Sequence, residues 1–178
     1  FALNELFNGG IDKFELARVG QATEHNYCGV KCGIMDQFAS VFGKAGNLMR
    51  LDCRSMEFEY FPFNPQGYKL VLLDSVVKHE LVGSPYNDRR ASCERVAAKL
   101  GQEFLRGATM AQLDAIKGEI SEEDYKRARY VIGEEQRVLD VCEALKRDDY
   151  ETVGKRMYET HWGMSKDYEV SCEELDFL

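Results

Sequence analysis

The sequence lacks any stretch that is both long and apolar enough to cross a lipid bilayer, which excludes a membrane-spanning helix of ordinary length. It also lacks an excess of positive charge, because 31 acidic residues outnumber 23 basic residues and the formal net charge is −8. An anionic chain is not attracted nonspecifically to nucleic acid or to acidic lipids. We therefore expect neither nucleic acid nor a membrane as a partner, and chemistry on a small molecule fits better.

The six cysteines lack the arrangement of a disulfide framework. They are scattered among predicted helices and strands instead of framing loops, at positions 28, 32, 53, 93, 142 and 172. This pattern favours reduced thiols and a cytoplasmic location. His25, Cys28 and Cys32 could supply metal ligands, but no second pair follows at zinc-finger spacing, so we expect no metal site.

The most informative segment that is present is Gly33–Phe38, which predicts a short helix. Apolar side chains fall on one face of this helix and polar side chains on another: Ile34, Phe38, Val41 and Phe42 against Asp36, Gln37 and Ser40. A carboxylate in a first helical turn is stabilised in its charged form by about 0.3–1 kcal/mol. Asp36 is therefore the candidate for chemistry, although an aspartate here is also simply a good helix start.

The remaining pattern predicts a chain of 178 residues with 44% hydrophobic content that can bury a core and could form one domain or parts of two. Alternation, apolar stripes and turn residues predict helices over 12–21, 86–100, 121–145 and 150–164, and strands over 47–53, 56–63 and 70–73. The last of these strands is apolar throughout, which is typical of a strand buried on both faces. We expect residues 1–63 and 64–178 to belong to different domains.

Both ends of the chain fall inside predicted helices. The sequence begins at Phe1 within a helical pattern and has no initiator methionine. Ser171 and Glu174 have the spacing of a capping box, and the chain stops four residues later. We therefore expect an internal fragment of a longer protein, truncated at both ends.

The segment Glu24–Phe38 resembles the region around the active-site aspartate of galactokinases. Further resemblances follow in the same order along the chain, at Leu51–Ser55, Val77–Arg90, Arg127–Glu134 and Ser165–Cys172. Galactokinases are part of the small-molecule kinase superfamily that also contains homoserine, mevalonate and phosphomevalonate kinases. The resemblance implies an α+β, two-domain small-molecule kinase fold, with residues 1–63 ending the N-terminal kinase domain and residues 64–178 beginning the C-terminal one.

The resemblance also implies roles for three residues. In galactokinases the aspartate that matches Asp36 lies beside the anomeric hydroxyl of galactose and acts as catalytic base or as electrostatic support. The glycine that matches Gly33 contacts the sugar, and the tyrosine that matches Tyr86 reaches the sugar from the other domain. Two departures from the family pattern, Lys31 and Pro85, concern the shape of the adjoining loops.

The family uses ATP and Mg²⁺, but its glycine-serine-rich phosphate loop is not found in residues 1–178. The resemblance implies that the longer parent protein makes galactose 1-phosphate. Because the phosphate loop is missing, we expect the isolated chain to be inactive, and we also expect it to be open to self-association. Two alternatives remain: a galactose-sensing regulator on the same scaffold, or a kinase for a related sugar such as N-acetylgalactosamine or arabinose. Arg89, Arg90, His79 and His161 are expected to be structural or surface residues, and Asp167 a cap for the segment that follows it.

Overall fold

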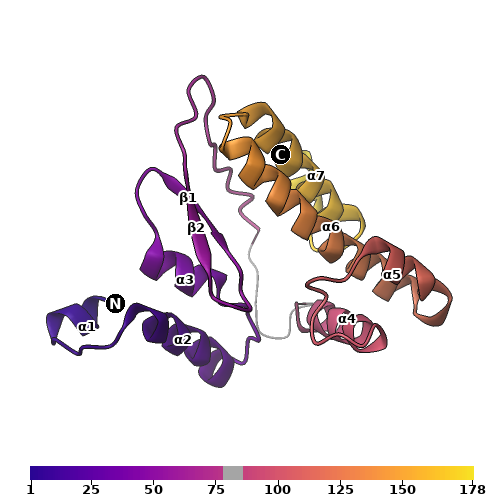
Figure 1. Ribbon diagram of the computed structural model, residues 1–178, viewed down its shortest axis with the longest axis horizontal. Coiled ribbons are helices and arrows are strands. Elements are labelled where there is room, and N and C mark those ends of the chain that lie inside the picture. Colours follow the sequence, from indigo (N-terminus) through magenta and orange to yellow (C-terminus); the bar gives the residue numbers. More distant parts are fainter. Residues whose placement is uncertain (78–85) are drawn as a thin grey trace. The chain divides into compact units, whose positions relative to one another are not determined.

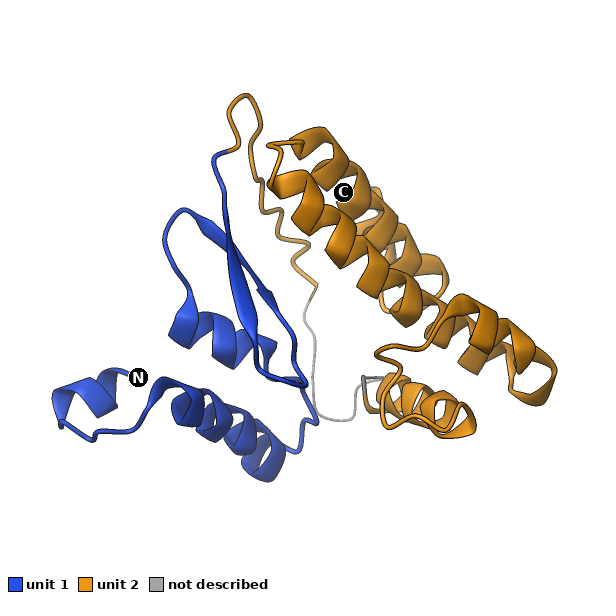
Figure 2. Cartoon of the chain, viewed as in Figure 1, with its two compact units in different colours: residues 1–64 blue, residues 65–178 orange. Residues whose placement is uncertain are grey.

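The structure is a computed structural model that describes residues 1–77 and 86–178, with Tyr86 described by its backbone alone. The chain divides into two compact units, Phe1–Asn64 and Pro65–Leu178 (Figure 2). Each unit buries its own set of apolar side chains. Among the described residues, no helix combines the length and apolarity that a membrane span requires.

Unit 1 combines helices with one antiparallel β-hairpin (Figure 1). Asn47 lies opposite Pro62 and Leu51 opposite Phe58 in the hairpin. The helix predicted over 12–21 and the strands predicted over 47–53 and 56–63 are present with slightly different ends. In chain order the elements are α1 (Ala2–Leu6), α2 (Lys13–Thr23), a π turn (Glu24–Cys28), α3 (Met35–Phe42), β1 (Asn47–Leu51) and β2 (Phe58–Pro62).

The core of unit 1 forms where α2, α3 and the hairpin meet around Phe38. Phe38 is fully buried, and its ring stacks on Phe42 at a centroid distance of 4.2 Å and meets Phe58 edge-on at 5.3 Å. Ala17 of α2 is also fully buried, and Ile34 is 5% exposed. The apolar face predicted for α3 is therefore confirmed, and it leaves the opposite face of the helix to solvent.

Unit 2 is built from helices, and its longest helix, α6, contacts α4, α5 and α7. The core between α4, α5 and α6 includes Val96, Leu113, Ala128 and Ile132, none more than 7% exposed. Figure 1 shows α6 and α7 running side by side. In chain order the elements are α4 (Tyr86–Lys99), α5 (Met110–Ala115), a 3₁₀ turn (Lys117–Glu119), α6 (Glu122–Leu145), α7 (Tyr150–Lys166) and α8 (Glu173–Phe177).

Local sequence explains where the helices of unit 2 begin and end. Ser121 precedes α6 in extended conformation and accepts a hydrogen bond from the backbone N–H of Asp124. Gly101 follows α4 with φ of +69°, a conformation that glycine adopts without a steric penalty. The helices predicted over 86–100, 121–145 and 150–164 are confirmed.

The strand predicted over Leu70–Leu73 is wrong. This segment has no regular secondary structure, and its exposed fractions run from 59% at Leu73 to 92% at Leu72. A strand is stable only when a neighbouring strand accepts and donates its backbone hydrogen bonds. Within the described residues the sheet contains β1 and β2 alone, so the apolar run has no strand to pair with.

The capping box predicted for Ser171 and Glu174 is also wrong. The N-cap of α8 is Cys172, which makes no side-chain capping bond. The Ser171 hydroxyl instead donates to Asp176 Oδ1 at 2.7 Å, and Ser165 of α7 donates to Asp176 Oδ2 at the same distance. A carboxylate that can accept from two hydroxyls has displaced the local capping interaction.

Candidate functional site

Asp36 lies in the first turn of α3, on the face opposite the buried Phe38, and its side chain is exposed. The N-cap residue, Ile34, offers no side-chain acceptor to the first backbone N–H groups of the helix. The first backbone N–H groups of the helix are therefore not capped by this side chain, and Asp36 is the acidic residue of the first turn. Ser40 lies one turn later and donates to the Asp36 carbonyl at 2.8 Å, which leaves the carboxylate itself accessible.

Gly33 lies in the segment before α3 and is exposed. It does not have a positive φ, so its backbone conformation does not require glycine. Apart from its two neighbours in the chain, no atom of the described residues lies within 4 Å of a Cβ added at this position, so packing among them does not require glycine either. Without a side chain, the backbone at Gly33 is open to close approach by another group.

The backbone just before Gly33 is held by side chains of α2 and of the π turn. The Cys32 carbonyl accepts from His25 Nε2 at 2.8 Å and from Gln21 Nε2 at 3.2 Å. Gln37 of α3 places its amide 3.9 Å from Cys32 Sγ. Sequence reasoning missed Gln21 and Gln37 as neighbours of the site, because no local pattern shows which side chains reach a given carbonyl.

Tyr86 is the first residue of α4 in unit 2, and its side chain lies outside the described residues. His79 also lies outside the described residues, as does Pro85, which differs from the galactokinase pattern. Gly33 and Asp36 are close in unit 1 because they belong to one loop and the helix that follows it. The role of all three residues stays a prediction.

Arg89, three residues after Tyr86, ties the start of α4 to the segment after α7. Its guanidinium donates to the Glu169 carbonyl at 2.7 Å and to the Tyr168 carbonyl at 3.2 Å. Arg90 pairs with Glu94 one turn along the same helix at 2.8 Å. These contacts are of the structural kind expected for the two arginines.

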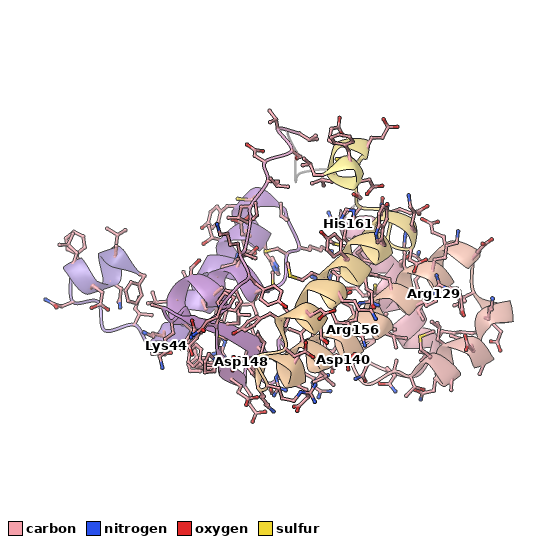
Figure 3. The ribbon with its side chains drawn as sticks, turned by 90° about the horizontal axis from the view of Figure 1, so that it is seen from above. Lys44, Arg129, Asp140, Asp148, Arg156 and His161 are labelled. Carbon is pink, nitrogen blue, oxygen red and sulfur yellow. The ribbon has the colours of Figure 1, made fainter. Side chains whose placement is uncertain are left out.

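The conspicuous polar residues near the end of α7 have partners within unit 2. His161 Nε2 lies 3.3 Å from Asp176 Oδ1, and Asp167 accepts from Arg129 at 2.5 Å. Asp167 is also the C-cap residue of α7, and its predicted role as a cap for the following segment stays a prediction. Along the same helix pair, Arg156 of α7 meets Asp140 of α6 at 2.9 Å (Figure 3).

A hollow of about 400 Å³ opens between α6 and α7. Arg129 lines it but is paired with Asp167, and Arg137 lines it but is paired with Glu134 at 2.8 Å. Burial raises the pKa of Tyr130 in its wall, so this phenol stays neutral. A bound anion would have to compete with acids that already neutralise these arginines.

Metal-ligating side chains do not converge in the part of the chain that the structure describes. No group of three or more His, Cys, Asp or Glu side chains there could hold a metal ion. The six cysteines are free thiols. Burial raises the pKa of the Cys93 thiol, which lowers its reactivity at neutral pH.

Comparison with known proteins gives this geometry a context. A family model described as GHMP kinases N terminal domain matches residues 1–44, the part of unit 1 that contains Gly33 and Asp36. A galactokinase from Thermotoga petrophila is 43% identical over all 178 residues, which make up 50% of that relative. A galactokinase from Homo sapiens is 43% identical over 162 residues, covering 91% of this chain and 41% of the relative.

A solved structure is also similar. The crystal structure of Lactococcus lactis galactokinase complexed with galactose matches with a TM-score of 0.91 and 32% identity, over 99% of this chain and 47% of that one. The α+β fold of a small-molecule kinase is thereby confirmed. The chain is thus related to the GHMP kinases. Among them it is related to the galactokinases, and it spans about half the length of the curated relatives that it matches.

Proposed function

We propose that this chain carries part of the sugar site of an ATP-dependent galactokinase, which phosphorylates the anomeric hydroxyl of galactose to galactose 1-phosphate. The observation that carries the proposal is an accessible carboxylate, Asp36, in a first helical turn, three residues after a glycine with open space around it. The similarity to galactokinases over the whole chain supports galactose as the substrate.

In this proposal Asp36 acts on the attacking oxygen of the sugar. A carboxylate within about 3 Å can accept the proton of the hydroxyl as that oxygen attacks the terminal phosphate. A carboxylate is a far weaker base than an alkoxide, so it does not ionise the sugar before the reaction. The proton passes late, when bond formation to phosphorus has made the hydroxyl acidic, and the negative charge of Asp36 stabilises the hydroxyl until then.

Gly33 and Tyr86 complete the proposed sugar contacts. Gly33 allows the sugar to approach the backbone, and Tyr86 reaches it from the beginning of α4. The same proposal assigns residues 1–63 to the end of the N-terminal kinase domain and residues 64–178 to the start of the C-terminal domain. It also assigns the protein to the cytoplasm.

ATP with Mg²⁺ is the proposed phosphoryl donor, but the residues present do not fit a site for either. The described residues contain no metal-ligating cluster, and residues 1–178 contain no glycine-serine-rich phosphate loop. We therefore assign the residues of this chain to the sugar and not to the nucleotide. The 178-residue chain alone is expected to make no galactose 1-phosphate, and turnover by a clean preparation would contradict this.

Replacing Asp36 with asparagine tests the proposal in the protein expressed from its full coding sequence. We expect Asp36→Asn to lower kcat for galactose by about 10²-fold to 10⁴-fold, because the proton acceptor is lost, and to leave ATP affinity nearly unchanged. The matched control is Glu15→Gln, which removes an exposed carboxylate from the first turn of α2. Equal effects of the two substitutions, or a loss of ATP binding, would refute the assigned role.

Two other functions fit the same scaffold. A galactose-sensing regulator would bind galactose without turnover, and a kinase for a related sugar would prefer N-acetylgalactosamine or arabinose. Calorimetry with galactose, combined with a phosphorylation assay over a panel of sugars, separates the three. Binding without turnover would favour the regulator.

A further inference from the structure

The peptide unit between Cys32 and Gly33 is fixed on one side only. Its carbonyl oxygen accepts two hydrogen bonds, from His25 Nε2 at 2.8 Å and from Gln21 Nε2 at 3.2 Å. A carbonyl oxygen has two lone pairs, so both are used. Because the carbonyl can only accept, His25 must carry its proton on Nε2 in this arrangement.

The other side of the same peptide unit is open. A trans peptide is planar, so its N–H points away from its C=O, and the described residues contain no cis peptide. The two bonds that hold the carbonyl therefore also fix the direction of the Gly33 N–H, away from His25 and Gln21. That N–H makes no hydrogen bond within the described residues, and Gly33 is exposed with no atom near the position of a Cβ.

The two side chains that hold the Cys32 carbonyl, here called the clamp, come from α2 and from the π turn that continues it. His25 lies in the turn, Glu24–Cys28, which continues α2 and ends at Gly29 with φ of +69°. Such wider turns change the direction of the side chains relative to an α-helix and occur frequently at functional sites. His25 and Gln21 are four residues apart, a spacing that places two side chains on the same side of a helix, and both reach one oxygen.

We propose that His25 and Gln21 are positioning residues that hold the Cys32–Gly33 peptide so that the Gly33 N–H donates to an oxygen of the bound sugar. The identity of the sugar rests on the proposed function, whereas the clamp rests on the contacts of this chain. Neither side chain touches the sugar in this proposal. They act through one peptide plane, three residues before Asp36.

Selective isotope labelling reports on this peptide directly. The sequence contains only two Cys-Gly pairs, Cys28-Gly29 and Cys32-Gly33, so the 178-residue chain labelled with ¹³C-carbonyl cysteine and ¹⁵N-glycine gives two correlation signals. Cys28→Ser removes one of them and assigns both. In His25→Asn, which places its donor nearer the backbone, the Cys32-Gly33 signal should move by much more than the Cys28-Gly29 signal. In His25→Gln the side-chain amide nitrogen can occupy about the same position as Nε2. The Cys32-Gly33 signal should therefore return close to its wild-type position.

Kinetics of the protein from its full coding sequence then test the consequence for the sugar. We expect His25→Asn and Gln21→Leu to raise the KM for galactose by about tenfold, the effect of one misdirected hydrogen bond, with kcat and the KM for ATP nearly unchanged. His25→Gln should recover most of the affinity. A merely structural role would lower the melting temperature and raise both KM values together.

The outcomes separate this inference from the proposed function. An unmoved Cys32-Gly33 signal in His25→Asn overturns the inference whatever the enzyme does. A moved signal with an unchanged KM for galactose also overturns it. If the unsubstituted protein does not phosphorylate galactose, the proposed function fails. The inference is then tested by calorimetry of galactose binding to the same variants. Weaker binding in His25→Asn and Gln21→Leu supports it, and unchanged or absent binding overturns it.

Discussion

Ser92 occupies the centre of a buried polar cluster between α4 and α6. It is fully buried, while Asp124 and Arg127 are 8% and 6% exposed. The Ser92 hydroxyl donates to Asp124 and accepts from Arg127 Nη1 at 3.0 Å and from Arg95 Nη2 at 3.2 Å. One donor and two acceptor positions exhaust what a hydroxyl can offer. Ser92 therefore bonds to every other member of the cluster, while Arg95 also donates directly to Asp124 and Arg127 pairs with Glu123.

Ser92→Ala should destabilise unit 2 by about 1–3 kcal/mol, because Asp124 loses one buried donor and Arg127 Nη1 loses its acceptor. Urea unfolding followed by circular dichroism measures the loss. The matched control is Glu94→Ala on the same helix, which removes an exposed ion pair with Arg90 and should change stability by less than about 1 kcal/mol. Equal losses for the two variants would contradict the assigned importance of the cluster.

Asp124 also makes the stability of unit 2 depend on pH. The hydrogen bond from Arg95, and then that from Ser92, lowers the pKa of the Asp124 carboxyl in the folded chain. A lowered pKa adds stability above the pKa of the unfolded chain, about 3.9, and this stability is lost as the pH falls through the folded value. The wild type should therefore have a larger free energy of unfolding than Asp124→Asn near neutral pH, and this difference should shrink below about pH 4. A difference that stays constant in urea titrations from neutral to acidic pH would refute this.

At the scale of elements, α6 and α7 lie close together at Gly163. A Cβ added there would lie 2.7 Å from Cδ2 and 2.8 Å from Cε2 of Tyr130 on α6. The Tyr130 ring cannot easily move, since it packs against Tyr168 at a centroid distance of 5.0 Å and lies under the Arg137 guanidinium. The glycine is therefore required by packing between helices.

Two glycines of α7 provide a matched pair of substitutions. Gly163→Ala should destabilise unit 2, because overpacking costs about 1–3 kcal/mol and exceeds the gain of about 0.5–1 kcal/mol from better helix propensity. Gly154→Ala should stabilise it by about that gain, since no atom of the described residues beyond the helix's own nearby backbone and the two chain neighbours lies within 4 Å of the added Cβ. Thermal unfolding of both variants measures the difference, and a stabilising Gly163→Ala would show that the two helices can move apart at little cost.

Features that depend on one segment were predicted more reliably than those that depend on a distant partner, for a physical reason. The apolar face of α3 and the stripe along α6 follow from the period of a single segment, and Phe38, Ala128 and Ile132 are buried as expected. The strand over Leu70–Leu73 failed because a strand needs a partner that its own sequence does not specify. The cap at Ser171 failed because Asp176, five residues away, competes for the same hydroxyl.

At the scale of the whole molecule, exposed apolar side chains are the main liability of the isolated chain. Leu72 is 92% exposed, and α1 exposes Leu3 and Leu6 at 70% and 72%. Extended apolar segments and unpaired hairpin edges favour association between copies. We expect the sedimentation coefficient of the 178-residue chain to rise with concentration and Leu72→Asn to weaken that rise. A concentration-independent monomer would contradict this.

By itself the sequence determined the face of α3 on which Asp36 lies, because helical periodicity is a local property. It also determined the relation to galactokinases, because the order of residues carries that resemblance. Tertiary structure alone decided that His25 and Gln21 meet at the Cys32 carbonyl, that Ser92 organises buried charges, and that Gly163 touches Tyr130. These contacts join side chains through space, and their geometry depends on how whole helices and turns pack, which no single segment specifies.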